Sequence, residues 1–176
     1  MTQQRPGYWI DTYTGHYFWV LDPKPEEVYI RDIAHALSLM CRFNGLCSEF
    51  YSIGQHSIIV SDHCPRELKL YGLLHDAAEA YVSDVPTPVK KCLPGFKEIE
   101  DGILRAIFQR YGLDFPIPIE VKRIDKSVLN DEAKVLMPGA PRVWVTESEG
   151  LGIEIVPKEP KEVEKEFLQK FYELTS

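Results

Sequence analysis

Residues 66–82 read RELKLYGLLHDAAEAYV, and this stretch decides the fold class. Its apolar residues recur at helical spacing and form a broad stripe, which predicts one helix buried in the middle of a bundle. Three ionisable residues, His75, Asp76 and Glu79, lie among the apolar residues of its stretch 73–79. Because unpaired charges are costly to bury, we expect a bound partner for them.

The sequence on both sides of this stretch predicts more helices and one hairpin. Apolar residues at intervals of three and four predict helices over residues 30–43, 53–63, 96–111, 116–137 and 160–174. Residues 8–20 are rich in aromatic and β-branched side chains around Thr14-Gly15, which predicts a β-hairpin. Residues 142–156 are expected to be irregular. We therefore expect an all-α bundle of about six helices with a small N-terminal β-hairpin.

The composition is that of one ordinary globular domain of 176 residues, with 44% hydrophobic and 27% charged residues. The formal charge of -7 disfavours a nucleic-acid polymer as partner, because such a partner requires a basic patch. No apolar run approaches the roughly 20 residues of a membrane span, and the start lacks a signal peptide. We therefore expect a cytoplasmic protein with no membrane partner.

The four cysteines, Cys41, Cys47, Cys64 and Cys92, form no CxxC pair. They are too sparse for a disulfide scaffold, so we interpret them as reduced thiols. A zinc knuckle made of Cys41, Cys47 and Cys64 is the alternative.

The adjacent pair His75-Asp76 is a candidate for metal binding, because a neutral imidazole and an ionised carboxylate are both ligands of divalent cations. Two ligands hold a cation poorly, so other helices must contribute. His56 and Asp125 are the candidates, each on a different predicted helix. Glu79 lies one turn after His75, which places a carboxylate beside the metal without making it a ligand.

Other residues compete for two of these positions. His35 is the rival of His56, because it also lies on an apolar helix. Asp131 is the rival of Asp125, but its neighbours Asn130 and Glu132 indicate a solvated stretch. We therefore favour His56 and Asp125.

The order of these residues resembles the HD-domain metal-dependent phosphohydrolases. The run HDAAEAYVSDVPTPVK, residues 75–90, is similar to the HD-x-x-E and D-x-P-x-P-x-K motifs of their 5′-deoxynucleotidase branch. The matching positions are His75, Asp76, Glu79, Asp84, Pro86, Pro88 and Lys90. Arg42-Phe43 ahead of Gln55-His56-Ser57 resembles that branch's Arg-Trp ahead of Glu-His-Ser. Small phage and bacterial phosphohydrolases have a similar layout.

The resemblance covers residues 30–137, which we expect to form an HD core. The chain length predicts one domain over residues 1–176, with a hairpin appendage at 1–29 and an irregular segment with a last helix at 138–176. The resemblance implies one divalent metal ion, Mn, Co, Fe, Ni, Zn or Mg, held by His56, His75, Asp76 and Asp125. Glu79 and Asp84 are then the expected catalytic residues, and Arg42, Phe43 and Lys90 the expected substrate contacts.

The activity implied is hydrolysis of a small nucleotide, with phosphate released from (deoxy)nucleoside monophosphates, by a protein that forms a homo-oligomer. In this hypothesis the metal activates a water for in-line attack on phosphorus. The same core can host a dNTP triphosphohydrolase or a hydrolase of cyclic or alarmone nucleotides. The alternative outside enzymes is a scaffold module that binds a nucleotide without catalysis.

Overall fold

The computed structural model describes residues 5–137, 139 and 149–176, and most of these are helical. Strands β1 (Trp9–Asp11) and β2 (Tyr17–Trp19) pair antiparallel. The longer helices are α1 (Ile30–Leu39), α2 (Ile53–His63), α6 (Phe96–Arg110), α7 (Ile119–Leu136) and α8 (Pro160–Thr175). Residues 149–159 have no regular structure, and the rest of the expected irregular segment lies outside the described residues. The expected all-α fold with a small N-terminal hairpin is confirmed.

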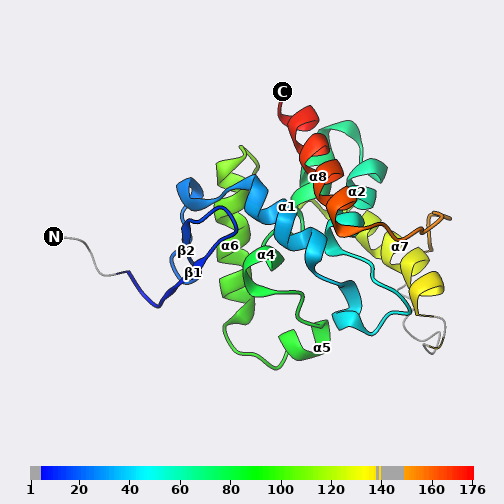
Figure 1. The fold of residues 1–176 in the computed structure, drawn as a ribbon, viewed down its shortest axis with the longest axis horizontal. Coiled ribbons are helices and arrows are strands. Elements are labelled where there is room, and N and C mark those ends of the chain that lie inside the picture. The colour runs from blue at the N-terminus through cyan, green and yellow to red at the C-terminus, as the bar shows by residue number, and fades with distance from the viewer. Residues whose placement is uncertain (1–4, 138, 140–148) are drawn as a thin grey trace.

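Helix α2 lies at the centre of the bundle, where it contacts α1, α7 and α8. Figure 1 shows α8 alongside α1 and α2, with the hairpin near α6 and away from α7. Fully buried side chains from these elements fill the interior, among them Phe18, Leu37, Ile53, Leu73, Ile107 and Phe167. Removal of this apolar surface from water is the main stabilising contribution. No helix in the part of the chain that the structure describes is long and apolar enough to cross a bilayer.

The stretch 66–82 is not one continuous helix, so that prediction is wrong. A 3₁₀ turn at Arg66–Leu68 leads into α3 (Lys69–Leu74), and α4 (Glu79–Val82) begins only after a tighter turn. Another short helix, α5 (Thr87–Lys90), follows Pro86, where the sequence predicted only an end to helical structure.

A side chain accounts for the interruption. The Nδ1 atom of His75 lies 2.7 Å from the carbonyl oxygen of Gly72, the acceptor that a continuous helix offers to the amide of Asp76. The next turn is closed by shorter-range bonds, such as the one from the amide of Glu79 to the carbonyl of Asp76 at 3.0 Å. The metal-binding candidates of this stretch therefore lie on a turn between two short helices.

The first helix is shorter than predicted, because α1 ends at Leu39. Met40 is extended, and the amide of Arg42 donates to the carbonyl of Tyr51 at 2.8 Å. Phe43 has a left-handed backbone, with φ of 55°. Arg42 and Phe43 therefore lie on the loop between α1 and α2, and their expected place on the first helix is wrong.

Helices α2 and α3 approach each other closely at Gly72. A Cβ atom built at this glycine would lie 2.9 Å from the Cα of Ser61 and 2.9 Å from the Sγ of Cys64. A side chain does not fit in that space, so the glycine allows the two helices to bring His56 and His75 together.

Gly72→Ala is expected to lower the free energy of unfolding by about 1–3 kcal/mol, because the added methyl group overpacks this contact. Urea unfolding measures the change. Gly102→Ala on α6 is the matched control, since a Cβ there meets nothing within 4 Å, and it should leave stability unchanged or raise it. Equal effects of the two substitutions would contradict the close approach as the role of Gly72.

Candidate metal centre

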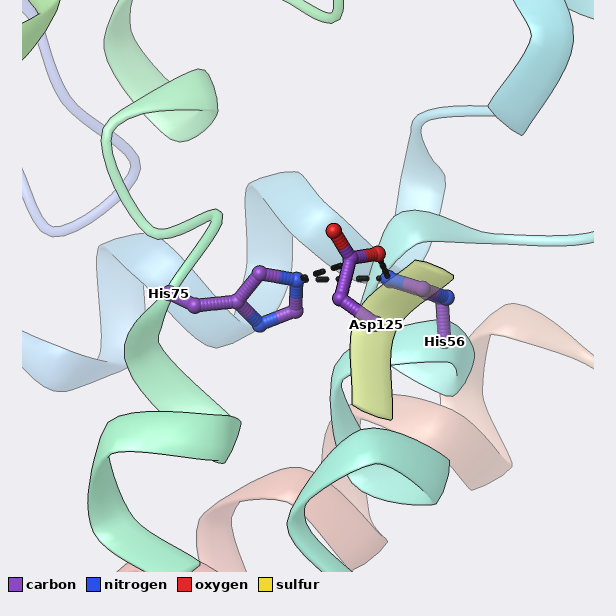
Figure 2. A group of neighbouring side chains, drawn as sticks. All are labelled: His56, His75 and Asp125. Atoms are coloured by element: carbon purple, nitrogen blue, oxygen red, sulfur yellow. Dashed lines mark hydrogen bonds and ion pairs between the residues drawn. The ribbon is translucent and has the colours of Figure 1, made fainter. Parts of the chain in front are cut away.

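Three buried or half-buried side chains from three helical segments converge in the interior. His56 comes from α2, His75 follows the last residue of α3, and Asp125 comes from α7. The Nε2 atoms of the two histidines are 3.2 Å apart, and Oδ1 of Asp125 lies 3.1 Å from Nε2 of His56 and 3.9 Å from that of His75 (Figure 2). In the described part of the chain, these three residues form a group that could hold a metal ion.

The tautomer of each histidine ring is set by the hydrogen bond that its Nδ1 atom makes. Nδ1 of His75 lies 2.7 Å from the carbonyl oxygen of Gly72, which can only accept, so Nδ1 carries the proton. Nδ1 of His56 lies 2.8 Å from Oε1 of Glu132, a buried carboxylate, and donates in the same way. With both rings neutral, each Nε2 would point a lone pair at the other, a repulsive arrangement that either a proton or a cation between the two atoms resolves.

Asp76 adds a second carboxylate to this group. Its Oδ2 lies 3.2 Å from Nε2 of His75 and 3.7 Å from Nε2 of His56. Burial alone would raise the pKa of Asp76, but His75, His56 and Arg42 outweigh burial and hold that pKa well below its ordinary value. The carboxylate is therefore ionised and available as a ligand.

The surroundings of the two histidines favour a positive charge. Burial lowers the pKa of His75, but Asp76 and Asp125 outweigh it and raise that pKa to about 9. The pKa of His56 is also raised, because Glu132 and Asp125 outweigh burial and the nearby Arg42. Two imidazole nitrogens and two carboxylates are a mixed donor set that can bind a divalent metal cation.

Glu132, which was not predicted as a site residue, lies behind His56. Its carboxylate is fully buried and accepts hydrogen bonds from the Tyr51 hydroxyl at 2.8 Å and from Nδ1 of His56. Oε2 lies 3.1 Å from Nη2 of Arg42. Burial raises the pKa of Glu132, but Arg42 and His56 outweigh it and lower that pKa to about 2.

The reading of the stretch around Glu132 as solvated is therefore wrong. Asn130, Asp131 and Glu132 are all buried. The available signal was spacing, since Glu132 follows Asp125 by two helical turns and so lies on the same face of α7.

Arg42 is buried between two carboxylates. Its Nη1 lies 3.6 Å from Oδ2 of Asp76, and its Nη2 contacts Glu132. The ring centroid of Phe43 is 5.4 Å from the guanidinium carbon. In this position Arg42 orients a metal-binding candidate, and the predicted contacts of Arg42 and Phe43 with a substrate stay predictions.

Glu79 and Lys90 face each other beside the cluster. Nζ of Lys90 lies 3.4 Å from Oε1 of Glu79 and 2.6 Å from Oε1 of Glu100. Oε2 of Glu79 is buried and has no hydrogen-bond partner in the described residues.

Burial, with Asp76 and Asp84 nearby, raises the pKa of Glu79 well above its ordinary value. The pKa of Asp84 is raised by its own burial, which outweighs the nearby Arg42.

A pocket of about 310 Å³ opens next to the cluster. The residues that line it include His75, Asp76, Glu79, Lys90, Glu100, Asp101, Leu104, Phe115 and Ile117. Arg42, Phe43 and Asp84 are not among these residues. The volume is at the lower end of the range for small-ligand sites.

The rival residues lie elsewhere. His35 stacks on Tyr13, with ring centroids 3.6 Å apart, and its Nδ1 is 3.2 Å from Glu164. Asp131 accepts a hydrogen bond from the amide of Ile153 and pairs with Lys134. His56 and Asp125 are therefore the residues that the structure brings together with His75.

The cysteines do not form the alternative zinc site among the described residues. The Sγ atoms of Cys41 and Cys47 are 3.4 Å apart, whereas Cys64 is buried with Val60 and Val121. These three residues do not make a group that could hold a metal.

The fold and this cluster define a helical protein with a candidate metal centre of two histidines and an aspartate. No protein-family model matches the chain. It is 34% identical over 170 residues to the uncharacterized protein YfdR of Escherichia coli (strain K12), a match over 94% of this chain and 95% of the relative. The uncharacterized protein RCAP_rcc00048 of Rhodobacter capsulatus is 34% identical over 129 residues, covering 68% of this chain and 66% of the relative. The chain belongs to the same family as YfdR.

Proposed function

We propose that the chain is an HD-type, metal-dependent phosphohydrolase that releases phosphate from nucleoside monophosphates. The observation that carries this proposal is the pair of Nε2 atoms 3.2 Å apart, flanked by the carboxylates of Asp76 and Asp125 and adjoining a pocket. His56, His75, Asp76 and Asp125 would hold one divalent cation. Mixed imidazole and carboxylate donors suit Mn²⁺, Co²⁺, Fe²⁺, Ni²⁺ or Zn²⁺.

A divalent cation bound there would lower the pKa of a water molecule and polarise a phosphoryl oxygen. In the overall reaction an oxygen from water bonds to phosphorus and the ester P–O bond breaks, which gives phosphate and an alcohol. The leaving oxygen requires a proton. Glu79 is suited to supply it, because its raised pKa favours the protonated form of the carboxyl and its Oε2 has no partner among the described residues. Lys90, which lines the same pocket, would hold the phosphate.

Glu79→Gln is expected to lower kcat by about a hundredfold or more, because it removes the positioned proton donor. The metal content should stay at that of the wild type, since Glu79 is not proposed as a ligand. Phosphate release and elemental analysis measure the two properties. Glu98→Gln, at an exposed position of α6, is the matched control and should change neither. Equal loss of metal would make Glu79 a ligand, and an unchanged kcat would make its role structural.

Lys90→Ala is expected to weaken nucleotide binding by about 1.5–3 kcal/mol, the range for a charge-assisted hydrogen bond. KM and isothermal titration with a product nucleotide measure the change. Lys91→Ala is the control, because Lys91 is exposed and does not line the pocket. If both variants bind like the wild type, the phosphate is held by other residues.

The charges along the pocket favour a monophosphate over a triphosphate. Three carboxylates, of Asp76, Glu100 and Asp101, line the pocket with three lysines, Lys90, Lys97 and Lys122, and with the carboxyl group of Glu79. A triphosphate carries more negative charge than this lining can compensate. We therefore propose a single phosphate group as the substrate's charged part.

The test is a product assay on protein stripped of metal and reloaded with each divalent cation in turn. We expect inorganic phosphate from nucleoside monophosphates only in metal-loaded samples. Tripolyphosphate from a dNTP would support the triphosphohydrolase alternative. Full activity in metal-free protein would refute the proposal, and nucleotide binding without turnover under any metal would indicate a scaffold module.

A further inference from the structure

The pocket beside the metal cluster has an apolar wall that the proposed chemistry does not use. Leu104 of α6 and residues 115–117, which precede α7, form this wall. Glu79 and Lys90 line the same pocket next to the cluster. A substrate whose phosphate lies at the cluster would therefore bring its organic part to the apolar wall.

The aromatic ring in this wall lies beside two other side chains. The guanidinium carbon of Arg105 lies 4.2 Å from the ring centroid of Phe115, and the ring of Phe108 in the core is 6.5 Å away. Leu104 is buried and Ile117 is half-buried. Side chains that are buried or half-buried have already lost part of their conformational freedom, so they lose less of it when a ligand packs against them.

The charged residues near the wall argue against a second phosphate there. Nζ of Lys97 lies 2.7 Å from a carboxylate oxygen of Asp101. This cation is already compensated by a carboxylate that lines the same pocket. An anionic group would meet repulsion at this end, whereas an uncharged group would not.

We infer that Leu104, Phe115 and Ile117 form a subsite for an uncharged aromatic ring, so that the preferred substrates are phosphate monoesters whose alcohol carries such a ring. The inference rests on the proposed function for the reaction and adds how the leaving alcohol is recognised. A ring in this subsite removes apolar surface of both partners from water and packs against the ring of Phe115.

Ile117→Ala and Phe115→Leu test the subsite with two monoesters, thymidine 5′-monophosphate and ribose 5-phosphate, at saturating Mn²⁺. The ratio of kcat/KM for the thymidine ester over the sugar ester is expected to fall about tenfold in each variant, because apolar contact is lost. Ile119→Ala is the matched control, since Ile119 is exposed and does not line the pocket, and it should keep the ratio. An unchanged ratio in both subsite variants overturns the inference.

Binding of thymidine, which has no phosphate, gives a second measurement that needs no turnover. In an NMR titration the wild type should bind thymidine, and each subsite variant should bind it about tenfold more weakly. Equal binding by all variants overturns the inference. If binding depends on Ile117 but neither ester is hydrolysed with any metal, the proposed function fails and the subsite stands. If Ile117→Ala does not fold, Ile117→Val replaces it, with a smaller expected loss in thymidine binding and in the kcat/KM ratio.

Discussion

Replacing Asp76 with alanine is expected to abolish metal binding and phosphate release together. The substitution removes an ionised carboxylate 3.2 Å from Nε2 of His75, and the proposed centre is left with His56, His75 and Asp125. The turn that carries Asp76 should survive, because alanine is compatible with helical backbone. Metal content after gel filtration and phosphate release from a nucleoside monophosphate measure the two losses.

Asp101→Ala is the matched control for this experiment. Asp101 lines the same pocket but lies on α6, where it pairs with Lys97. The variant should keep its metal and most of its activity. Stoichiometric metal in Asp76→Ala would refute the assignment of Asp76 as a ligand.

Glu132→Ala is expected to lower the free energy of unfolding by about 3–5 kcal/mol, because it removes the nearer of the two carboxylates that compensate the buried guanidinium of Arg42. The Tyr51 hydroxyl and Nδ1 of His56 also lose their acceptor. Without that acceptor the tautomer of His56 is no longer fixed, so metal affinity should fall by about 10–100-fold. Urea unfolding of metal-free protein and a competition titration with a chelator measure the two effects.

Glu120→Ala on the same helix is the control. Glu120 is exposed and its contact with Arg123 is long, at 3.5 Å, so the change in stability should stay within about 0.5 kcal/mol. Glu132→Gln keeps an oxygen acceptor but loses the charge. Its loss in free energy of unfolding should lie between those of Glu132→Ala and Glu120→Ala. If Glu132→Ala unfolds like the wild type, the ion pair with Arg42 contributes nothing measurable.

The helices and the metal candidates could be predicted from sequence because both depend on local patterns. The helix over residues 53–63 begins and ends as predicted, and in the structure the Ser52 side chain caps it by accepting from the amide of Gln55. His56, His75 and Asp125 were found as ionisable residues on apolar helices, and the structure brings them together. A continuous helix over residues 66–82 was wrong, because periodicity does not reveal a side chain that takes a backbone acceptor, as His75 does at Gly72.

The roles of the residues behind the cluster were not predicted, because they depend on segments far apart in the sequence. Glu132 has a polar sequence neighbourhood, yet Tyr51, His56 and Arg42 surround it from the other side. Arg42 looked like a free cation for a phosphate, and only the packed loop shows that it is buried between carboxylates. Charge composition does not distinguish a solvated carboxylate from one that is compensated in the interior.

Three separate helical segments supply the clustered side chains. This arrangement affects how long the protein persists. An unfolded chain does not hold His56, His75 and Asp125 together, so a cation held by them would bind only the native state. By mass action, free metal at about a thousand times its dissociation constant adds about 4 kcal/mol to the native state. The fraction of chains exposed to proteases would then fall as metal becomes available, so that metal supply controls how much of the protein persists.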